Sequence, residues 1–268
     1  MSSYKIEAGT AQHIGGRAQQ NDRTALFAGA QAPGYIMAVL ADGLSGGAIA
    51  PEQVLHTSKQ LFDDYRSSDT VNLGRIEELL RNIVLEAHTI IKMSPIVASM
   101  EPQSTIVLLI ITPQGQAVWA HVGDSRLYRF SHKECLERSN DNDYVEHLIA
   151  TDNVPPEAAK RHRSSKLLSN VLGNKFKEPY VTVGRYEGLE AGDAFLLCSD
   201  GLWQYFADNE LAGVVERVAP RQAAERLIGK ANERAVGKGD NCTMAIVRLV
   251  KPPKEVQTYT VEKMRRAV

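Results

Sequence analysis

Four aspartates stand beside short apolar runs of the 268-residue sequence, at points where such runs begin, end or break. Asp42 and Asp200 each follow an apolar run. Asp124 interrupts another run, and Asp240 comes two residues before a fourth. An ionised carboxylate is unstable inside a sheet unless it has a partner. We therefore expect these side chains to face a cleft at the ends of strands.

Four carboxylates in one cleft would repel one another unless a cation neutralised them. The nearby donors are oxygens and the sequence has no Cys/His cluster, which favours a hard divalent ion such as Mg²⁺ or Mn²⁺. Gly43, directly after Asp42, would let a backbone carbonyl approach the ion. The alternative is a set of ordinary Asp-Gly turns, which suits any one aspartate alone better than all four together.

Arg17 lies upstream of these aspartates, five residues before a further acid, Asp22. A guanidinium group can bind a phosphate through two parallel hydrogen bonds. Considered alone, Arg17 is an ordinary solvated arginine. Beside a metal cluster, it would instead be a natural phosphate clamp.

Short apolar or β-branched runs bounded by turn residues predict the strands that would carry these groups. They cover residues 36–41, 105–112, 117–130, 181–186, 194–199 and 243–250. Helical spacing predicts helices over residues 51–66, 73–93, 210–218 and 223–236, and residues 113–115 have the composition of a hairpin turn. Strands and helices do not alternate strictly, so we expect an α+β domain with largely antiparallel sheets.

The composition is that of an ordinary globular domain, with 43% hydrophobic and 24% charged residues. A formal net charge of -1 gives no sign of nucleic-acid or anionic-membrane binding. Three scattered cysteines do not form a disulfide framework. The N-terminus lacks the apolar region of a signal peptide, and the strongest apolar run, 106–111, is too short to span a bilayer. We expect a cytoplasmic location.

Taken in order, the motifs resemble those of the metal-dependent type 2C serine/threonine protein phosphatases (the PPM family), in their bacterial form. The similarity covers residues 5–250. It includes segments similar to R-x-x-N-E-D, A-D-G-M-G-G, G-T-T, G-D-S-R-x-Y, L-T-x-A-L-G, S-D-G-L-W and D-N-x-T. They lie at residues 17–22, 41–46, 103–105, 123–128, 168–173, 199–203 and 240–243. One such motif would be weak evidence, whereas the ordered series is specific.

The resemblance implies a four-layer α/β/β/α sandwich, in which two central antiparallel sheets are flanked by helices. It also implies a single catalytic domain over residues 1–250, with a flap-like insertion at 139–172. Residues 251–268 would form a C-terminal tail.

Roles for the site residues follow from the same resemblance. Asp42 would bridge two Mn²⁺ or Mg²⁺ ions, and Gly43 would contribute its carbonyl. Asp200 and Asp240 would complete the two-metal site. Asp124 would hold a third ion together with Asp200.

The activity implied is hydrolysis of phosphoserine and phosphothreonine in proteins, reversing a serine/threonine kinase. Arg17 would contact the phosphate, and Asp22 would lie in or next to the first metal shell. A hydroxide bridging the two metal ions would attack phosphorus directly. The partners would be phosphorylated proteins and a cognate kinase, with the chain acting as a monomer.

Two departures from the family pattern keep another function open. Asn21 replaces the usual glutamate, and Leu44 stands where bacterial members commonly have methionine and many eukaryotic members have histidine. Reduced metal affinity and a missing general acid would suit a catalytically weak module that binds or senses a phosphoprotein. Asp42, Asp124, Asp200, Asp240 and Arg17 are all retained, which favours the enzyme.

Two other chemistries have matching sequence patterns. Ser45 lies in a G-x-S-x-G sequence after a strand, as a hydrolase nucleophile would. Cys242 precedes Arg248 with the spacing of a cysteine phosphatase. The first interpretation leaves the other aspartates unexplained, and the second requires a phosphate-binding loop where the sequence predicts a strand. We expect Cys242 to be a buried core residue.

Overall fold

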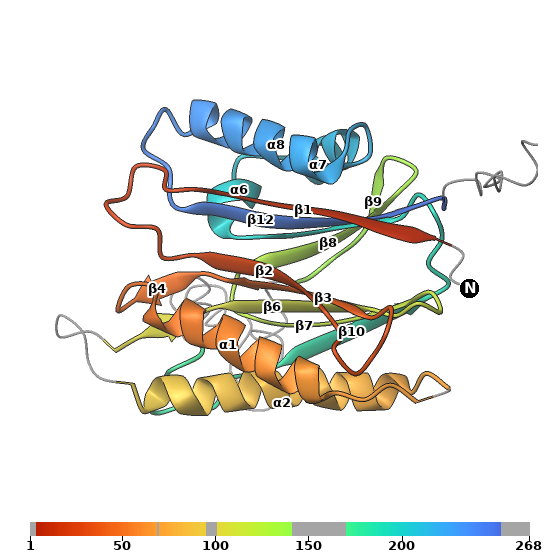
Figure 1. The fold of residues 1–268 in the computed structure, drawn as a ribbon. Helices are drawn as coiled ribbons and strands as arrows, with labels where there is room; N and C mark the ends of the chain where they lie inside the picture. Colours follow the sequence, from red (N-terminus) through yellow and green to blue (C-terminus); the bar gives the residue numbers. More distant parts are fainter. Residues whose placement is uncertain (1–3, 69, 95–100, 141–169, 253–268) are drawn as a thin grey trace, which may run out of the picture.

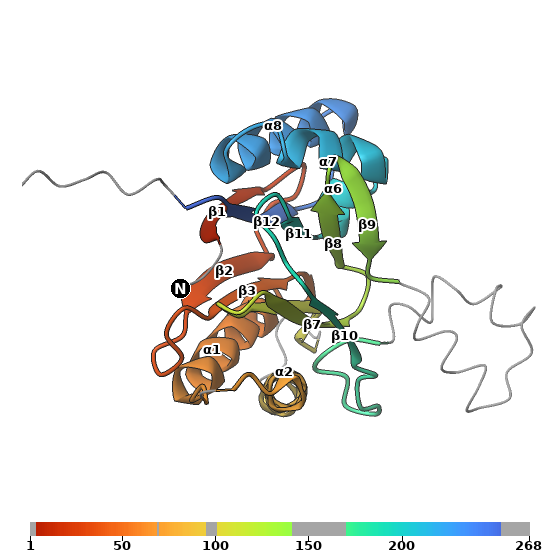
Figure 2. The same ribbon diagram turned by 90° about the vertical axis from the view of Figure 1, so that its right-hand side faces the viewer.

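The computed structural model describes residues 4–68, 70–94, 101–140 and 170–252. Two five-stranded antiparallel sheets pack face to face, and helices cover both outer faces (Figures 1 and 2). Most of the predicted insertion at 139–172 and nearly all of the predicted tail at 251–268 lie outside the described residues. Both remain predictions.

Every strand in the two main sheets runs antiparallel to its neighbours. The first sheet has the order β1 (Lys5–His13), β12 (Cys242–Val250), β11 (Ala194–Cys198), β8 (Arg126–Ser131) and β9 (Glu134–Arg138). The second has the order β10 (Thr182–Glu187), β7 (Gln116–Val122), β6 (Ile106–Ile111), β3 (Ile36–Ala41) and β2 (Arg23–Ala28). A short ladder also joins β4 (Gly43–Ser45) to β5 (Gln103–Ser104).

The helices form the two outer layers. The second sheet is covered by α1 (Ile49–Asp64) and α2 (Leu73–Lys92). The first sheet is covered by α6 (Asp200–Trp203), α7 (Asp208–Val215) and α8 (Pro220–Arg234). Within the described residues, none of the helices combines the length and apolar character needed to cross a bilayer.

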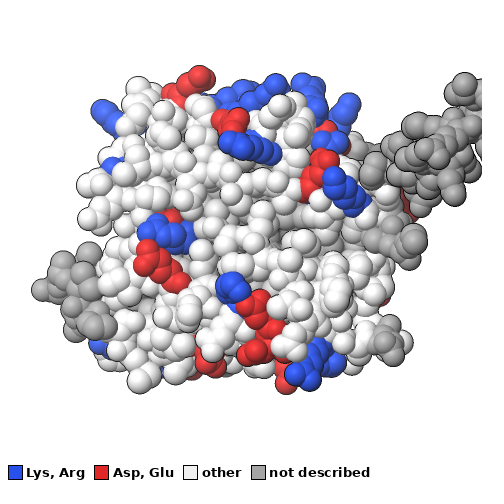
Figure 3. Space-filling model, in the orientation of Figure 1, with Lys and Arg blue, Asp and Glu red and all other residues white. Residues whose placement is uncertain are grey.

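Acidic and basic side chains are interspersed on the face shown in Figure 3, with Lys and Arg most frequent along its upper edge, over α8.

The layering also determines the hydrophobic cores. Central strands bury both faces because each sheet is covered on both sides. In β6 the residues facing the helices are Ile106, Leu108 and Ile110. Those facing the other sheet are Val107, Leu109 and Ile111.

The α+β fold class and the antiparallel sandwich predicted from the sequence are confirmed. The prediction of a single strand over residues 117–130 is wrong, because β7 ends at Val122 and β8 starts at Arg126 in the other sheet. Gly123, with φ of 97°, makes the turn between them. Strands β1, β2 and β9 were not predicted. All three are edge strands whose residues are mostly half-buried or exposed, so they lack a continuous apolar run.

Candidate active site

In the first sheet, strand register brings three aspartates to one end. Cys198, the last residue of β11, pairs with the beginnings of both β12 and β8. Asp200 directly follows this end of β11, Asp240 precedes β12, and Asp124 precedes β8. Antiparallel pairing therefore places three acids that are far apart in sequence beside one another.

The second sheet contributes its acids at the same end. Ala41, the last residue of β3, pairs with Arg23, the first residue of β2, so Asp42 and Asp22 are adjacent. The end of β7 pairs with the beginning of β6 at this end too. From there the chain passes through Asp124 into β8 of the first sheet, so the two sheets share one site.

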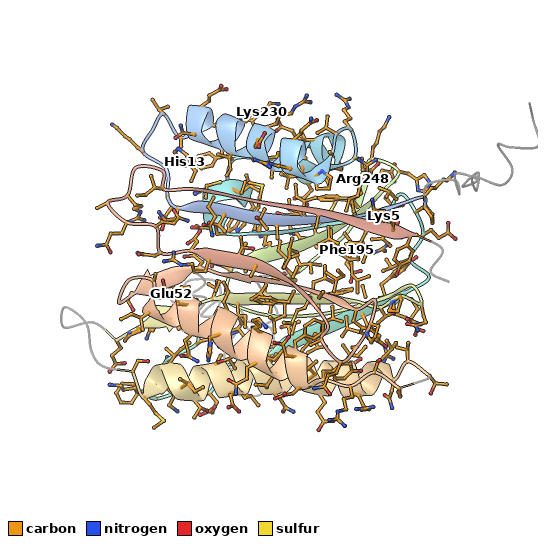
Figure 4. The ribbon with its side chains drawn as sticks, in the orientation of Figure 1. Lys5, His13, Glu52, Phe195, Lys230 and Arg248 are labelled. Atoms are coloured by element: carbon orange, nitrogen blue, oxygen red, sulfur yellow. The ribbon has the colours of Figure 1, made fainter. Side chains whose placement is uncertain are left out.

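These loops enclose a cavity of about 260 Å³. Figure 4 marks this end of the sandwich by His13, the last residue of β1, and Glu52, in the first turn of α1. The cavity is lined by Arg17, Asn21, Asp42, Gly43, Leu44, Asp124, Asp200, Asp240 and Asn241. Every predicted site residue is in this lining except Asp22, which is 1% exposed and lies behind Asp42.

Burial and mutual repulsion raise the pKa values of three of these carboxyl groups. Burial, followed by repulsion from Asp124 and Asp240, raises the pKa of Asp200 to about 7. Burial, followed by the charges of Asp22 and Asp200, raises the pKa of Asp42 well above its usual range. Burial raises the pKa of Asp22 to about 6. A cation in the cavity would favour the ionised form of each group.

Asp22 is held in place by a hydroxyl from the opposite sheet. The Ser199 Oγ–H donates to Asp22 Oδ2 over 2.8 Å, and the same Oγ accepts the Thr243 N–H over 3.1 Å. Asp22 also shares a hydrogen bond with Asp42. Ser199 is fully buried and was not predicted as a site residue. Its signals in the sequence are its position directly before Asp200 and its place as the first residue of the motif at 199–203.

Arg17 and Asp240 face each other at the mouth of the cavity. Arg17 Nε–H donates to Asp240 Oδ1 over 2.7 Å, and its Nη2 pairs with Oδ2. The Arg17 side chain is 61% exposed, so this pair contributes little to stability. The sequence predicted Arg17 as a phosphate ligand and Asp240 as a metal ligand, and did not predict that the two would contact each other.

Asn241 fixes the loop that carries Arg17. Its side-chain amide donates to the carbonyls of Ile14 (2.9 Å) and Gln19 (3.0 Å), and its Oδ1 accepts the Asn21 N–H over 2.7 Å. Asn241 is 4% exposed, so these bonds are shielded from water. Asn241 was not predicted as a site residue, although it lies next to Asp240 in the last motif.

The backbone at Asp42 is fixed by the strand that follows α2. The Ser104 hydroxyl and the Thr105 N–H both donate to the Asp42 carbonyl over 3.0 Å. The Asp42 N–H donates to Thr105 Oγ1 over 3.1 Å. A Cβ at Gly43 would lie 3.0 Å from the Asn21 carbonyl and its Cβ, so this position needs the small residue.

The loop at Asp124 is anchored from α6. The Trp203 Nε1–H donates to the Asp124 carbonyl over 3.0 Å, and the Arg126 guanidinium stacks on the Trp203 ring at 3.5 Å. The Ser125 and Thr105 hydroxyls share a hydrogen bond of 2.8 Å. Trp203 is partly buried against the core under α8, and it holds the Asp124 loop from there.

The donor set fits hard divalent ions. The residues that line the cavity offer carboxylate oxygens, and none of them offers a sulfur or imidazole ligand. Burial has raised the pKa values of the central acids, as expected where a cation is needed to balance their charge. Within the described residues, no group of three or more His, Cys, Asp or Glu side chains is already arranged to hold a metal ion. Asp240 is paired with Arg17, and Asp42 shares a hydrogen bond with Asp22.

Neither rival nucleophile lies in the cavity lining. Ser45 is in β4, and its hydroxyl donates to the Glu101 carbonyl. Cys242 is 5% exposed in β12, and burial raises the pKa of its thiol to about 12. A thiol with that pKa is not a thiolate at neutral pH, so the expectation of a core cysteine is confirmed.

Comparison with known proteins finds one family. A model of the family described as Protein phosphatase 2C matches residues 9–233. Protein phosphatase PhpP of Streptococcus pneumoniae is 30% identical over 222 residues, or 81% of this chain and 87% of PhpP. Serine/threonine protein phosphatase PstP of Mycobacterium tuberculosis is 28% identical over 240 residues, or 88% of this chain. The chain spans 43% of the length of PstP.

Solved structures agree with these matches. The serine/threonine phosphatase of S. agalactiae has a TM-score of 0.73 at 24% identity, covering 91% of this chain and 99% of its own, which supports the fold. The catalytic domain of Mycobacterium tuberculosis PstP, solved in complex with two manganese ions, has a TM-score of 0.64 at 25% identity. That match covers 91% of this chain and 98% of the PstP chain.

Proposed function

The chain belongs to the protein phosphatase 2C family, and we propose that it hydrolyses phosphoserine and phosphothreonine in proteins with the help of divalent metal ions. The observation that supports this most directly is the convergence of Asp42, Asp124, Asp200 and Asp240 with Arg17 on one cavity. A monoester phosphate carries two negative charges, so the site needs both cations and a guanidinium to hold it.

The metal ligands that we propose come from separate loops at one end of the sandwich. Asp42, the Gly43 carbonyl, Asp200 and Asp240 would hold two Mn²⁺ or Mg²⁺ ions, and Asp124 with Asp200 would hold a third. When bound, such ions lower the pKa of water and neutralise charge on the phosphoryl group.

Asp22 acts behind this layer, through its hydrogen bond to Asp42 and its contact with Ser199. It keeps the Asp42 carboxyl aimed into the cavity. The manganese ions seen with PstP support the same cofactor for this chain.

Arg17 would bind the phosphoryl oxygens. To do so it must leave Asp240, with which it pairs at the cavity mouth. The exposed arginine can rotate at low energetic cost, and Asn241 keeps the loop beneath it fixed. Arg17 would exchange its contact with Asp240 for one with the phosphate. Asp240 would exchange its contact with Arg17 for one with a metal ion.

Water is the attacking group in this proposal. Among the described residues, the cavity lining contains no Ser, Thr, Cys, His or Lys, and its aspartates are the metal ligands of this proposal, which leaves water as the nucleophile. Leu44 lies in the lining and cannot donate a proton, which favours water as the group that protonates the leaving serine or threonine oxygen.

The physiological substrates would be phosphorylated proteins, and a serine/threonine kinase would be the opposing enzyme. We also propose a cytoplasmic location, because all three cysteines are unpaired, as in a reducing compartment. We further propose a single catalytic domain over residues 1–250 that acts as a monomer.

Hydrolysis of a phosphothreonine peptide tests the proposal. We expect turnover with Mn²⁺, its loss with excess chelator, and a loss of at least ~100-fold in kcat for Asp42→Asn or Asp240→Asn. Asp64→Asn, an exposed acid at the end of α1, is the matched control and should retain full activity. Phosphopeptide binding without turnover by the wild-type chain would instead favour the sensing module.

A further inference from the structure

His88 is a buried titratable residue of α2 that the proposed chemistry does not use. Its side chain is fully buried, and its Nδ1 accepts the Gly173 N–H over 3.1 Å. The proton of the neutral ring is then on Nε2, which lies 3.6 Å from the Glu178 carboxylate. Burial lowers the pKa of His88, so the imidazole is neutral at pH 7 and Nδ1 can act as an acceptor.

Gly173, the last residue of the motif at 168–173, is packed between α2 and the residue before β5. Its φ is 84°, and a Cβ there would lie 2.5 Å from Ile91 Cγ2 and 2.3 Å from the Pro102 carbonyl oxygen. The position therefore requires glycine. Its hydrogen bond to His88 is buried, so loss of the acceptor would leave a buried backbone N–H unpaired.

Leu172, the preceding residue, connects this position to the backbone of the metal ligands that we propose. The Leu172 N–H donates to the Ser104 carbonyl over 2.9 Å, and its carbonyl accepts the Ser104 N–H over 3.3 Å. The Ser104 hydroxyl donates to the Asp42 carbonyl over 3.0 Å. Ser104 also pairs with Gly43 in the β4–β5 ladder. Successive hydrogen bonds thus run from a side chain of α2 to both residues.

We infer that His88 is a positioning residue for the metal site, and that its hydrogen bond to the segment after the motif fixes the backbone of Asp42 and Gly43 in the geometry that binds metal. This rests on the proposed function, which makes those two residues metal ligands. Partners outside the ligands themselves commonly set metal affinity by orienting them. Arg17 lies on a different loop, so phosphate binding should depend little on His88.

Manganese binding measured by equilibrium dialysis tests this inference. His88→Leu removes the acceptor and should raise the Kd for Mn²⁺ by about tenfold. His88→Asn places an amide oxygen close to the position of Nδ1 and should stay within about threefold of the wild-type Kd. Both variants lose the contact with Glu178, so the difference between them isolates the acceptor. Should His88→Leu not fold, His88→Gln, whose longer side chain carries its oxygen past the Nδ1 position, replaces it with the same expected loss.

Turnover of p-nitrophenyl phosphate gives a second readout. At a Mn²⁺ concentration near the wild-type Kd, His88→Leu should lower kcat and leave KM unchanged, since the metal site is affected and Arg17 is not. Raising the Mn²⁺ concentration should restore most of the lost kcat. His88→Asn should need no such excess.

Control variants separate positioning from a general loss of stability. Ile76→Ala removes buried apolar volume near the start of α2. It should lower the unfolding temperature at least as much as His88→Leu and keep the wild-type affinity for Mn²⁺. His56→Leu, at an exposed position of α1, should behave as wild type. Ser104→Ala combined with His88→Leu should raise the Kd by less than the product of the two single effects, because both act along one path.

The outcomes distinguish this inference from the proposed function. Wild-type Mn²⁺ affinity in folded His88→Leu overturns the role of His88 alone. An equal loss in His88→Asn also overturns it, since the acceptor would not matter, as does an equal loss in Ile76→Ala, since stability would then be the cause. Independent effects of Ser104→Ala and His88→Leu exclude the path between them. Failure of the wild-type chain to bind Mn²⁺ overturns the proposed function and the role of His88 together.

Discussion

Replacing Asp200 by asparagine should stabilise the chelator-treated protein while removing a metal ligand. Burial of the Asp200 carboxyl, followed by repulsion from Asp124, Asp240 and Asp22, raises its pKa to about 7. Asparagine has nearly the same shape and no charge. The variant therefore removes both the cost of burying the charge and the repulsion, and leaves the packing in place.

The size of the effect follows from the pKa. The change in the pKa of Asp200 from 3.8 to about 7 corresponds to roughly 4 kcal/mol, which screening of this partly exposed group reduces to ~2–4 kcal/mol. A raised pKa in the folded state means that this state binds more protons than the unfolded one. Stability is then fully present below the unfolded pKa of 3.8 and is lost as pH rises through about 7.

Urea unfolding in excess chelator measures this difference. At pH 8, Asp200→Asn should exceed the wild-type free energy of unfolding by ~2–4 kcal/mol, and at pH 5 the gap should fall to less than half. Asp64→Asn should show no gap at either pH. A variant less stable than wild type at pH 8, or a gap that does not change with pH, would refute the electrostatic reasoning.

Three other substitutions test separate parts of the site. Arg17→Ala should raise KM for p-nitrophenyl phosphate by about tenfold or more without weakening Mn²⁺ binding, since Asp240 loses a competing cation; an unchanged KM would exclude a phosphate contact. Asn241→Ala leaves buried backbone groups unpaired and should lower the free energy of unfolding by ~2–4 kcal/mol in urea titrations. A loss below about 0.5 kcal/mol would show that Asn241 does not fix the Arg17 loop. Cys242→Ala should retain turnover, because burial raises the pKa of that thiol to about 12, and inactivation by iodoacetamide at Cys242 would contradict this.

The acids of the site were predictable because each one interrupts or borders an apolar run. A charge at such a place requires a cleft, and four of them in ordered motifs indicate one cleft. The central strands were predictable for a related reason. They are buried on both faces, so their sequences are continuously apolar.

The supporting residues were not predictable in the same way. Asn241 and Ser199 are neutral and act on backbone or carboxyl groups more than 170 residues away in the chain. Neither spacing nor composition indicates such a contact, which exists only once the two sheets have packed. The Arg17–Asp240 pair has the same origin, because β1 and β12 pair with the register that brings both loops together.

Manganese stoichiometry tests the convergence of the aspartates most directly. Equilibrium dialysis of the wild-type chain should find at least two Mn²⁺ per chain, and Asp42→Asn should retain fewer than one at the same free concentration. Failure of the wild-type chain to bind Mn²⁺, or full binding by Asp42→Asn, would contradict the account.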